Sequence, residues 1–257
     1  MRVLAIETST RQGSVALLDE HGLVAETIAP APGAHLEWLV GAIVRLLRAH
    51  GLSPAAVEGL AVCTGPGSFT GVRVGVVTAT AWAEARDVPV IGVPVLEAIA
   101  AGVAEETPAA RLVLAAVDVR RAEVAAALFA LDDGIRRLSP DLVAPPAALP
   151  AALPVPDGPV VIAGDALERH RDALVAAVGP GALVAASPLW WPRARVVGRL
   201  GRARLLAGVR VDPARVQPVY PSREVARPRG RQEALAAGQN AGQGSRGGAG
   251  GAPAPGP

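Results

Sequence analysis

The order of apolar segments along the chain is the feature that most constrains its fold. Three short, partly alternating segments at 3–6, 14–18 and 23–27 are separated by TSTRQG and DEHG, which is typical of three antiparallel strands. The segments that follow predict a helix at 36–50, a strand at 59–63, a helix at 70–86, a strand at 90–93 and a helix at 94–104. This order predicts an α/β mixed sheet with helices packed on it.

The same order begins again after residue 110. RLVLAAVDV, AEVAAALFAL and GIRRLSPDLV predict a second set of three strands. A strand at 160–163, a helix at 166–178, a strand at 182–185 and an arginine-rich helix near 193–207 are expected after a proline-rich stretch. The repeat predicts two lobes of related topology, residues 1–107 and residues 108–225.

Residues 226–257 differ in composition from both predicted lobes. This segment is rich in Gly, Ala and Pro and offers little apolar surface to bury, which predicts a disordered tail. We expect that deleting residues 227–257 leaves both stability and partner binding intact.

Composition favours a protein of the cytoplasm. Hydrophobic residues make up 51% of the chain, but no run approaches the 18 apolar residues typical of a membrane-spanning helix. The start MRVLAIETST is too short and too weakly charged for a signal peptide, and Cys63 is the only cysteine. We therefore expect a cytoplasmic protein without membrane contact.

Positive charge is concentrated near the end of the chain. Residues 187–257 hold 12 arginines against 3 acidic residues. Such a segment is typical of contact with RNA or with an acidic partner, and equally of a solvated helix face followed by a charged tail. We therefore keep open the hypothesis that Arg199, Arg202 and Arg204 contact RNA.

The stretch CTGPGSFTGVRVG joins the predicted strand at 59–63 to the predicted helix at 70–86. A glycine-rich turn there can present backbone N–H groups to a phosphate or let another part of the chain approach closely. On the helix that follows, residues four apart share a face, so Gly71, Gly75, Ala79 and Ala83 form a ridge almost without side chains. This small-residue ridge predicts a close helix contact, either within the chain or with a second chain.

Phosphate binding is a hypothesis for two segments. The first is the hydroxyl-rich turn ETSTRQGS, where actin-like and sugar-kinase-like ATPases hold a nucleotide phosphate; a turn that binds nothing is the alternative. The second is the glycine-rich turn. The candidate nucleotide-binding residues in the two segments are Thr8, Ser9, Thr10, Gly65, Gly67 and Ser68.

Other chemistries find little support in the sequence. The four histidines lack the one-turn spacing of a metal pair, and GPGSFTG does not match the G-x-S-x-G turn of serine hydrolases. Cys63 ends a predicted buried strand, where cysteine is usually inert. The chain contains no lysine, which a Walker A loop requires.

Several motifs together resemble the TsaB family, formerly YeaZ, of bacterial tRNA threonylcarbamoyladenosine biosynthesis. They are MRVLAIETSTRQGSVALL, GLAVCTGPGSFTGVRVG and VPVIGVPVLEAIA, and they cover roughly the first 130 residues. A weaker similarity lies in PVYPSR, where Pro218 and Tyr220 match a P-x-Y segment of the family. The resemblance implies the actin-like fold of the acetate kinase, Hsp70 and actin superfamily.

The resemblance also implies partners. Members of this family form a homodimer when alone and a heterodimer with the catalytic paralogue TsaD, joined by the ATPase TsaE, and meet tRNA through the complex. The first two helices of the first lobe form the interface in that family. The residues to which this implication assigns partner binding are Leu36, Leu39, Ile43, Gly71, Val72, Gly75 and Ala79.

A comparison with TsaD-like chains implies that this chain has no active site of its own. Those chains carry an HxxxH metal pair where this sequence has Val95 and Ile99, and aliphatic side chains cannot ligate a metal. We therefore expect neither catalytic nor metal-binding residues, and no cofactor of its own, with ATP or ADP at the subunit interface left open. Catalysis would belong to TsaD, which modifies the adenosine beside the anticodon.

A standalone nucleotide-dependent kinase of the same superfamily is the alternative function, and a peptidase ranks below it. A kinase needs a metal-holding carboxylate and a base, for which Glu7 and Asp118 are the candidates. Glu7 stands where the family usually carries Asp, which weakens the nucleotide-binding hypothesis.

Overall fold

The first sheet has five strands in the order β3-β2-β1-β4-β5. The computed structural model describes residues 1–31, 33, 35–151, 153, 158–220 and 256, and of residues 35 and 36 the backbone only. The strands are β1 (Val3–Glu7), β2 (Ser14–Asp19), β3 (Gly22–Ile28), β4 (Gly59–Cys63) and β5 (Val90–Val93). β1 pairs antiparallel with β2 and parallel with β4, so the sheet is mixed as predicted.

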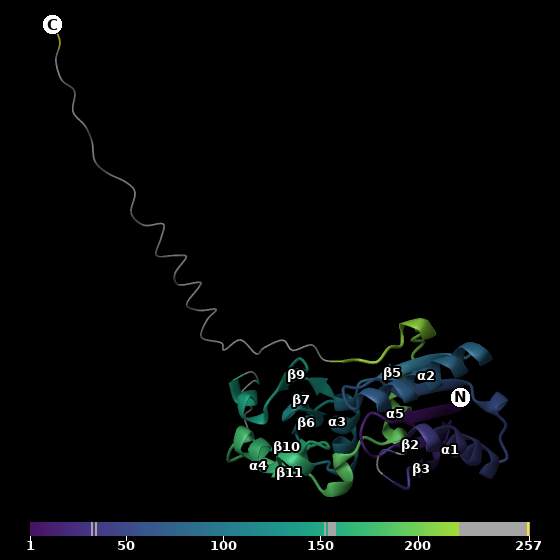
Figure 1. The fold of residues 1–257 in the computed structure, drawn as a ribbon, viewed down its shortest axis with the longest axis horizontal. Coiled ribbons are helices and arrows are strands. Elements are labelled where there is room, and N and C mark those ends of the chain that lie inside the picture. The colour runs from purple at the N-terminus through teal and green to yellow at the C-terminus, as the bar shows by residue number, and fades with distance from the viewer. Residues whose placement is uncertain (32, 34, 152, 154–157, 221–255, 257) are drawn as a thin grey trace.

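The second sheet repeats this arrangement in the order β11-β10-β6-β7-β8, with β9 paired to β7. Its strands are β6 (Leu112–Arg120), β7 (Glu123–Ala130), β8 (Arg136–Arg137), β9 (Leu142–Ala144), β10 (Val160–Ala163) and β11 (Ala182–Val184). Figure 1 shows the two sheets side by side, with their helices around them. The prediction of two lobes of related topology is confirmed for the described residues.

Five α-helices flank the two sheets in the described part of the chain. They are α1 (His35–Ala49), α2 (Phe69–Arg86), α3 (Val95–Glu106), α4 (Leu167–Val178) and α5 (Ala194–Leu206). Short 3-10 turns lie at η1 (Pro54–Ala56), η2 (Pro146–Ala151), η3 (Ser187–Trp190) and η4 (Pro213–Arg215). None of the described helices is long and apolar enough to cross a membrane.

Both faces of the first sheet are covered, which explains why β1 and β4 are buried along their whole length. Leu4 and Ile6 of β1 pack in a core cluster with α1 and α2. Val3 and Ala5, on the opposite face, belong to a second cluster that includes α3, α5 and the strands β6 and β7. That second cluster joins the two lobes.

Helix α5 departs from the predicted lobe boundaries. The sequence placed it in the lobe of residues 108–225, but it packs against β1, β2 and β4 of the first sheet. A Cβ at Gly201 would overlap the Ala61 side chain, and a Cβ at Gly198 would overlap Leu18. The first lobe is therefore built from residues 1–107 together with α5, because the glycines of α5 fit the small side chains of that sheet face.

The third strand predicted for the second lobe is divided into β8 and β9. Pro140 lies between them and has no N–H to donate to a ladder. The Ser139 hydroxyl accepts a hydrogen bond from the Leu128 backbone N–H at 3.0 Å. The predicted tail at 226–257 lies outside the described residues, apart from residue 256.

Candidate functional site

The hairpin between β1 and β2 and the turn before α2 pack directly on each other. The Ser68 backbone N–H donates to the Ser9 carbonyl oxygen at 2.6 Å, and the Thr8 hydroxyl donates to the Gly71 carbonyl oxygen at 2.7 Å. Gly67 permits this approach, because a Cβ there would overlap the Ser9 carbonyl oxygen. The glycine-rich turn therefore serves a close contact within the chain.

Glu7 lies at the end of β1 and is fully buried. Its Oε1 accepts hydrogen bonds from the Ser9 backbone N–H, at 2.7 Å, and from the Ser9 hydroxyl. Burial raises the pKa of the Glu7 carboxyl to about 8, although the hydrogen bonds from Ser9 act in the opposite direction. The group is therefore mostly neutral at pH 7, whereas Mg²⁺ is held by ionised carboxylates.

Cys63 lies beside this pair, with its Sγ 3.5 Å from the Ser9 Oγ. Burial raises the pKa of the Cys63 thiol well above its usual value. The side chain therefore stays a thiol at neutral pH, as expected for a cysteine that only packs.

A cleft of about 540 Å³ lies between the two lobes. Three of the candidate nucleotide-binding residues line it: Thr10, Gly67 and Ser68. The other three, Thr8, Ser9 and Gly65, are buried and do not line the cleft. The structure therefore brings only half of the predicted set to one cleft.

Charged groups in this cleft bind one another across the lobes. Arg11 forms an ion pair with Glu168 at 3.3 Å. On the second lobe, Arg169 pairs with Asp118 at 3.2 Å. Burial raises the pKa of the neighbouring Asp165 carboxyl to about 7, although it accepts a hydrogen bond from the Asp118 backbone N–H. The Arg11–Glu168 pair links the two lobes at the cleft, and the two ion pairs together balance much of its charge.

The small-residue ridge of α2 faces the interior. Gly71, Gly75 and Ala79 are buried, and a Cβ at Gly75 would overlap the Thr8 hydroxyl. The alternative of a contact within the chain, which the sequence left open, accounts for the ridge. The assignment of these three residues to partner binding is corrected, because they offer no surface to a second chain.

The other candidate partner-binding residues are also buried, where the structure describes their side chains. Leu39, Ile43 and Val72 are each no more than 1% exposed and belong to the core under α1 and α2. They hold the two helices on the sheet. Their assignment to direct contact with a partner is therefore also corrected. The side chain of Leu36 lies outside the described part of the structure.

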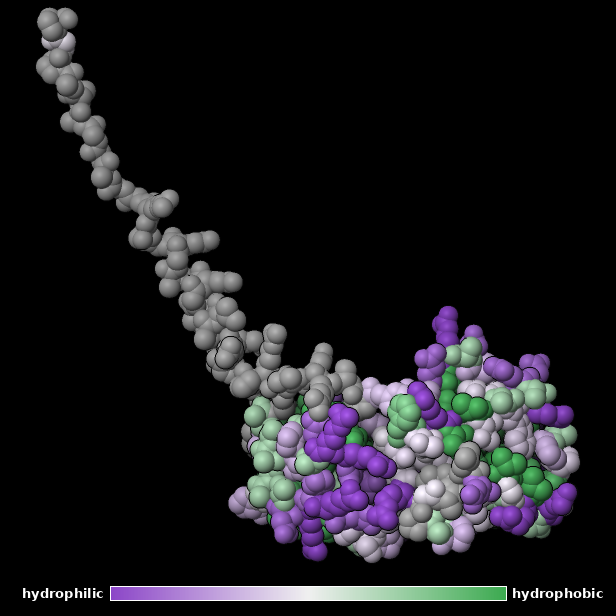
Figure 2. Space-filling model, in the orientation of Figure 1, coloured by the Kyte–Doolittle hydropathy of each residue, from purple (hydrophilic) through white to green (hydrophobic). Residues whose placement is uncertain are grey.

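The exposed faces of the same helices carry apolar side chains that the sequence analysis did not select. Val40 and Val44 of α1 are 60% and 37% exposed, and Val77 of α2 is 63% exposed. Figure 2 shows hydrophobic residues in the region where Figure 1 places α1 and α2. The signal was present in the sequence, since the apolar stripe of residues 36–47 is wider than one buried face requires.

The positions of the metal pair of TsaD-like chains lie in the core. Val95 is completely buried and Ile99 is 2% exposed, both on α3. Within the described residues, no group of His, Cys, Asp and Glu side chains is arranged to hold a metal ion. The residues present at this place do not fit a metal.

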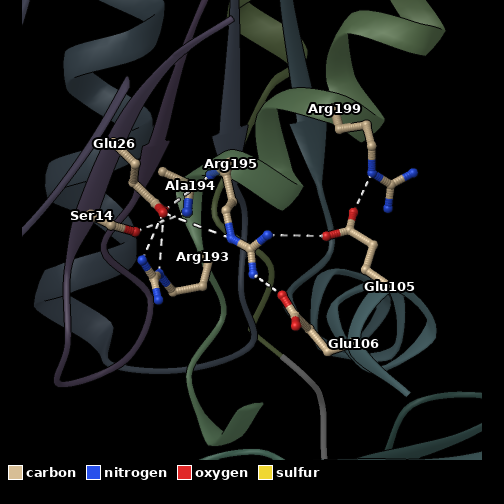
Figure 3. A network of polar contacts seen from close by, with 8 residues as sticks. All are labelled: Ser14, Glu26, Glu105, Glu106, Arg193, Ala194, Arg195 and Arg199. Atoms are coloured by element: carbon tan, nitrogen blue, oxygen red, sulfur yellow. Dashed lines mark hydrogen bonds and ion pairs between the residues drawn. The ribbon is translucent and has the colours of Figure 1, made fainter. Parts of the chain in front are cut away.

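The arginines of α5 are engaged within the chain, as Figure 3 shows in part. Glu26 accepts from the Arg193 side chain at 2.7 Å, and Arg195 reaches Glu105 at 3.4 Å and Glu106 at 2.8 Å. Arg199 also pairs with Glu105. These contacts link β3, α3 and α5.

The other two arginines proposed to contact RNA are also bound within the chain. Arg202 donates to the Met1 carbonyl oxygen at 3.1 Å, and Arg204 pairs with Glu97 at 2.5 Å. With their charges partnered in this way, the hypothesis of an RNA contact at Arg199, Arg202 and Arg204 loses its support.

The chain matches the model of one protein family over most of its two lobes. Residues 24–184, more than half of the 257 in the chain, match the model of a family described as TsaD: tRNA N6-adenosine threonylcarbamoyltransferase.

Two curated relatives are named tRNA threonylcarbamoyladenosine biosynthesis protein TsaB. The Escherichia coli protein is 38% identical over 133 residues, which span 52% of this chain and 57% of that protein, a little over half its length. The Bacillus subtilis protein is 29% identical over 210 residues, or 81% of this chain and 90% of that protein.

Among solved structures, YeaZ from Pseudomonas aeruginosa is similar with a TM-score of 0.75 and 29% identity. The alignment covers 86% of this chain and 99% of that one. Together with the strand orders, this similarity confirms the predicted α/β fold of two lobes, each with a mixed sheet flanked by helices.

Proposed function

This chain belongs to the TsaB (YeaZ) family, and from that premise we propose that it acts in tRNA threonylcarbamoyladenosine biosynthesis as a noncatalytic partner subunit. In this role it binds a TsaD-type transferase, and a TsaE-type ATPase joins the assembly in the cytoplasm. The names of its relatives support the pathway, and the exposed surface of the first lobe supports the role.

The observation that carries the proposal is the apolar face of α1 and α2. Val40 and Val77, both at least 60% exposed, lie on helices that contact each other on the outer side of the first sheet. Val44, one turn after Val40, extends this face along α1. Apolar side chains gathered on neighbouring helices are typical of an interaction surface, and the proposal assigns this surface to the transferase and, in its absence, to a second copy of the chain.

The interior of the chain supports a role without catalysis. Val95 and Ile99 cannot ligate a metal, and the Glu7 carboxyl is mostly neutral at pH 7. A kinase-like enzyme, the alternative function, needs an ionised carboxylate near the phosphates. In our proposal any ATP or ADP is therefore held where the subunits meet, and this chain contributes no cofactor of its own.

The test is association with the TsaD-type protein of the same genome, measured by size-exclusion chromatography with light scattering. We expect the native chain to form a heterodimer, and the double variant Val40→Glu, Val77→Glu to fail to form it, because two buried charges disfavour association.

The matched control is Leu183→Glu, a charge at a residue of β11 that is 53% exposed on the other lobe. This variant should associate as the native chain does. Circular dichroism should show all variants folded. A heterodimer that survives the double substitution would contradict the proposed surface.

A further inference from the structure

Two aromatic side chains stack on the surface of a chain that has few of them. The sequence contains 4 Trp, 2 Phe and 1 Tyr, and Phe129 is in the core. Phe69 and Tyr220 are instead 56% and 41% exposed, and their ring centroids lie 5.1 Å apart with planes inclined at 32°. The burial of aromatic surface that normally stabilises a fold is incomplete at both residues.

The backbone holds both rings in place. Phe69 is the first residue of α2, directly after Ser68, whose hydroxyl accepts from the Gly71 N–H. The Val219 N–H donates to the Thr64 carbonyl oxygen at 2.7 Å, which fixes the chain beside Tyr220. The rings are therefore preorganised, and a ligand that stacks on them does not have to order the backbone first.

A guanidinium group belongs to the same surface. The Arg73 Cζ lies 3.9 Å from the centroid of the Phe69 ring and 5.8 Å from that of Tyr220. No carboxylate of the described residues forms an ion pair with Arg73. We name Phe69, Arg73 and Tyr220 the aromatic platform.

The aromatic platform borders the interlobe cleft. Phe69 also lines the interlobe cleft, whose other wall includes Arg120. The acidic residues Asp118, Asp165 and Glu168 line the same cleft and offset the charges of Arg11, Arg120 and Arg169.

We propose that the aromatic platform binds single-stranded RNA. Exposed aromatic rings beside arginines are the combination with which proteins hold unpaired bases and their phosphates: a base stacks on a ring and the cations meet the backbone. The Arg73 guanidinium, which no carboxylate of the described residues pairs, favours a polyanion over an apolar partner protein. The proposal goes beyond the partner role, since it assigns direct RNA contact to this chain alone.

The experiment measures fluorescence anisotropy of a labelled single-stranded RNA 12-mer with the full isolated chain at several salt concentrations. We expect Phe69→Ala and Tyr220→Ala each to weaken binding about 10-fold. Arg73→Gln should weaken binding and lower the salt slope by about 1. Duplex RNA of the same length should bind more weakly than the single strand, because its bases are not free to stack.

Leu183→Ala, a truncation of an exposed side chain on the other lobe, is the control and should bind RNA as the native chain does. Thermal unfolding checks that each variant folds. Equal binding by the native chain and the platform variants would overturn the proposal, as would no binding by the native chain.

A second measurement separates this inference from the partner role. The platform variants should still form the heterodimer with the TsaD-type protein, and Val40→Glu, Val77→Glu should still bind RNA. Platform variants that lose the heterodimer while keeping RNA binding would reassign the platform to the protein interface and overturn the RNA proposal.

Discussion

Gly75 and Gly102 are both interior helix glycines, but their surroundings differ. A Cβ at Gly75 would overlap the Thr8 hydroxyl and lie 3.4 Å from Ile6, whereas a Cβ at Gly102 would meet only Val196, at 4.0 Å. The first glycine is required by the close packing of α2 on β1. The second is a position where glycine has a conformational cost and no packing benefit.

The two positions give opposite predictions for substitution by alanine. Gly75→Ala should lower the free energy of unfolding by about 1–3 kcal/mol, because the sheet and α2 must move apart. Gly102→Ala should raise it by about 0.5–1 kcal/mol through helix propensity. Urea unfolding of both variants checks this, and equal effects would mean that α2 does not pack on the hairpin as described.

Glu7 makes stability depend on pH. Its pKa is about 8 in the folded chain and 4.5 as the ordinary value, so between these limits the folded state binds more protons than the unfolded state. The stability associated with the neutral carboxyl is therefore complete below pH 4.5 and is lost as the pH rises through 8. Asp165, with a pKa raised to about 7, acts in the same direction.

We predict that Glu7→Gln flattens this dependence. The native chain should lose up to about 1.4 kcal/mol per pH unit from this one group between pH 5 and 8, and the neutral amide removes that contribution. Urea unfolding at pH 5.5, 6.5 and 7.5 gives the slopes. Glu84→Gln, at an exposed residue of α2, should keep the native slope; if Glu7→Gln keeps it too, the carboxyl is ionised in the folded chain.

At the scale of elements, the start of α5 is capped by the sheet on which it packs. Arg193, the residue before the helix, makes no side-chain cap. Instead, the Ala194 N–H donates to the Ser14 hydroxyl at 2.8 Å and the Arg195 N–H to Glu26 at 3.2 Å, as Figure 3 shows. A carboxylate beside a helix N-terminus is also favourable to the helix dipole.

Glu26→Ala should therefore destabilise the fold by about 1–3 kcal/mol, because it leaves the Arg193 guanidinium without its carboxylate and the Arg195 N–H without its acceptor. Arg11→Ala, which breaks the more exposed pair with Glu168, should cost about 0.5 kcal/mol or less. Thermal unfolding in low salt compares them. Similar losses for the two variants would show that Glu26 stabilises no more than a surface ion pair.

Single elements were predicted well where their own periodicity is strong. The strands at 3–6 and 59–63 and the helix at 70–86 agree with β1, β4 and α2 within one or two residues. The third strand of the second lobe was less accurate, because Pro140 interrupts its ladder and divides it into β8 and β9.

At the scale of the whole molecule, the lobes are joined by helices that serve both. α3 packs against β6 and β7 of the second sheet and also against α5, so one apolar cluster extends across the boundary. The interlobe ion pair of Arg11 with Glu168 adds to this connection at the cleft. The prediction that removal of residues 227–257 leaves stability and partner binding intact stays a prediction.

The sequence by itself determined the elements, the repeat of the two lobes and the family, because periodicity and the motif GPGSFTGVRVG are local properties. It also showed that Gly71, Gly75 and Ala79 make a close contact. Only the tertiary structure decided that this contact lies within the chain, that α5 returns to the first sheet, and that Phe69 meets Tyr220. Each of these depends on which side chains lie opposite one another across distant segments, and residue spacing along one segment does not carry that information.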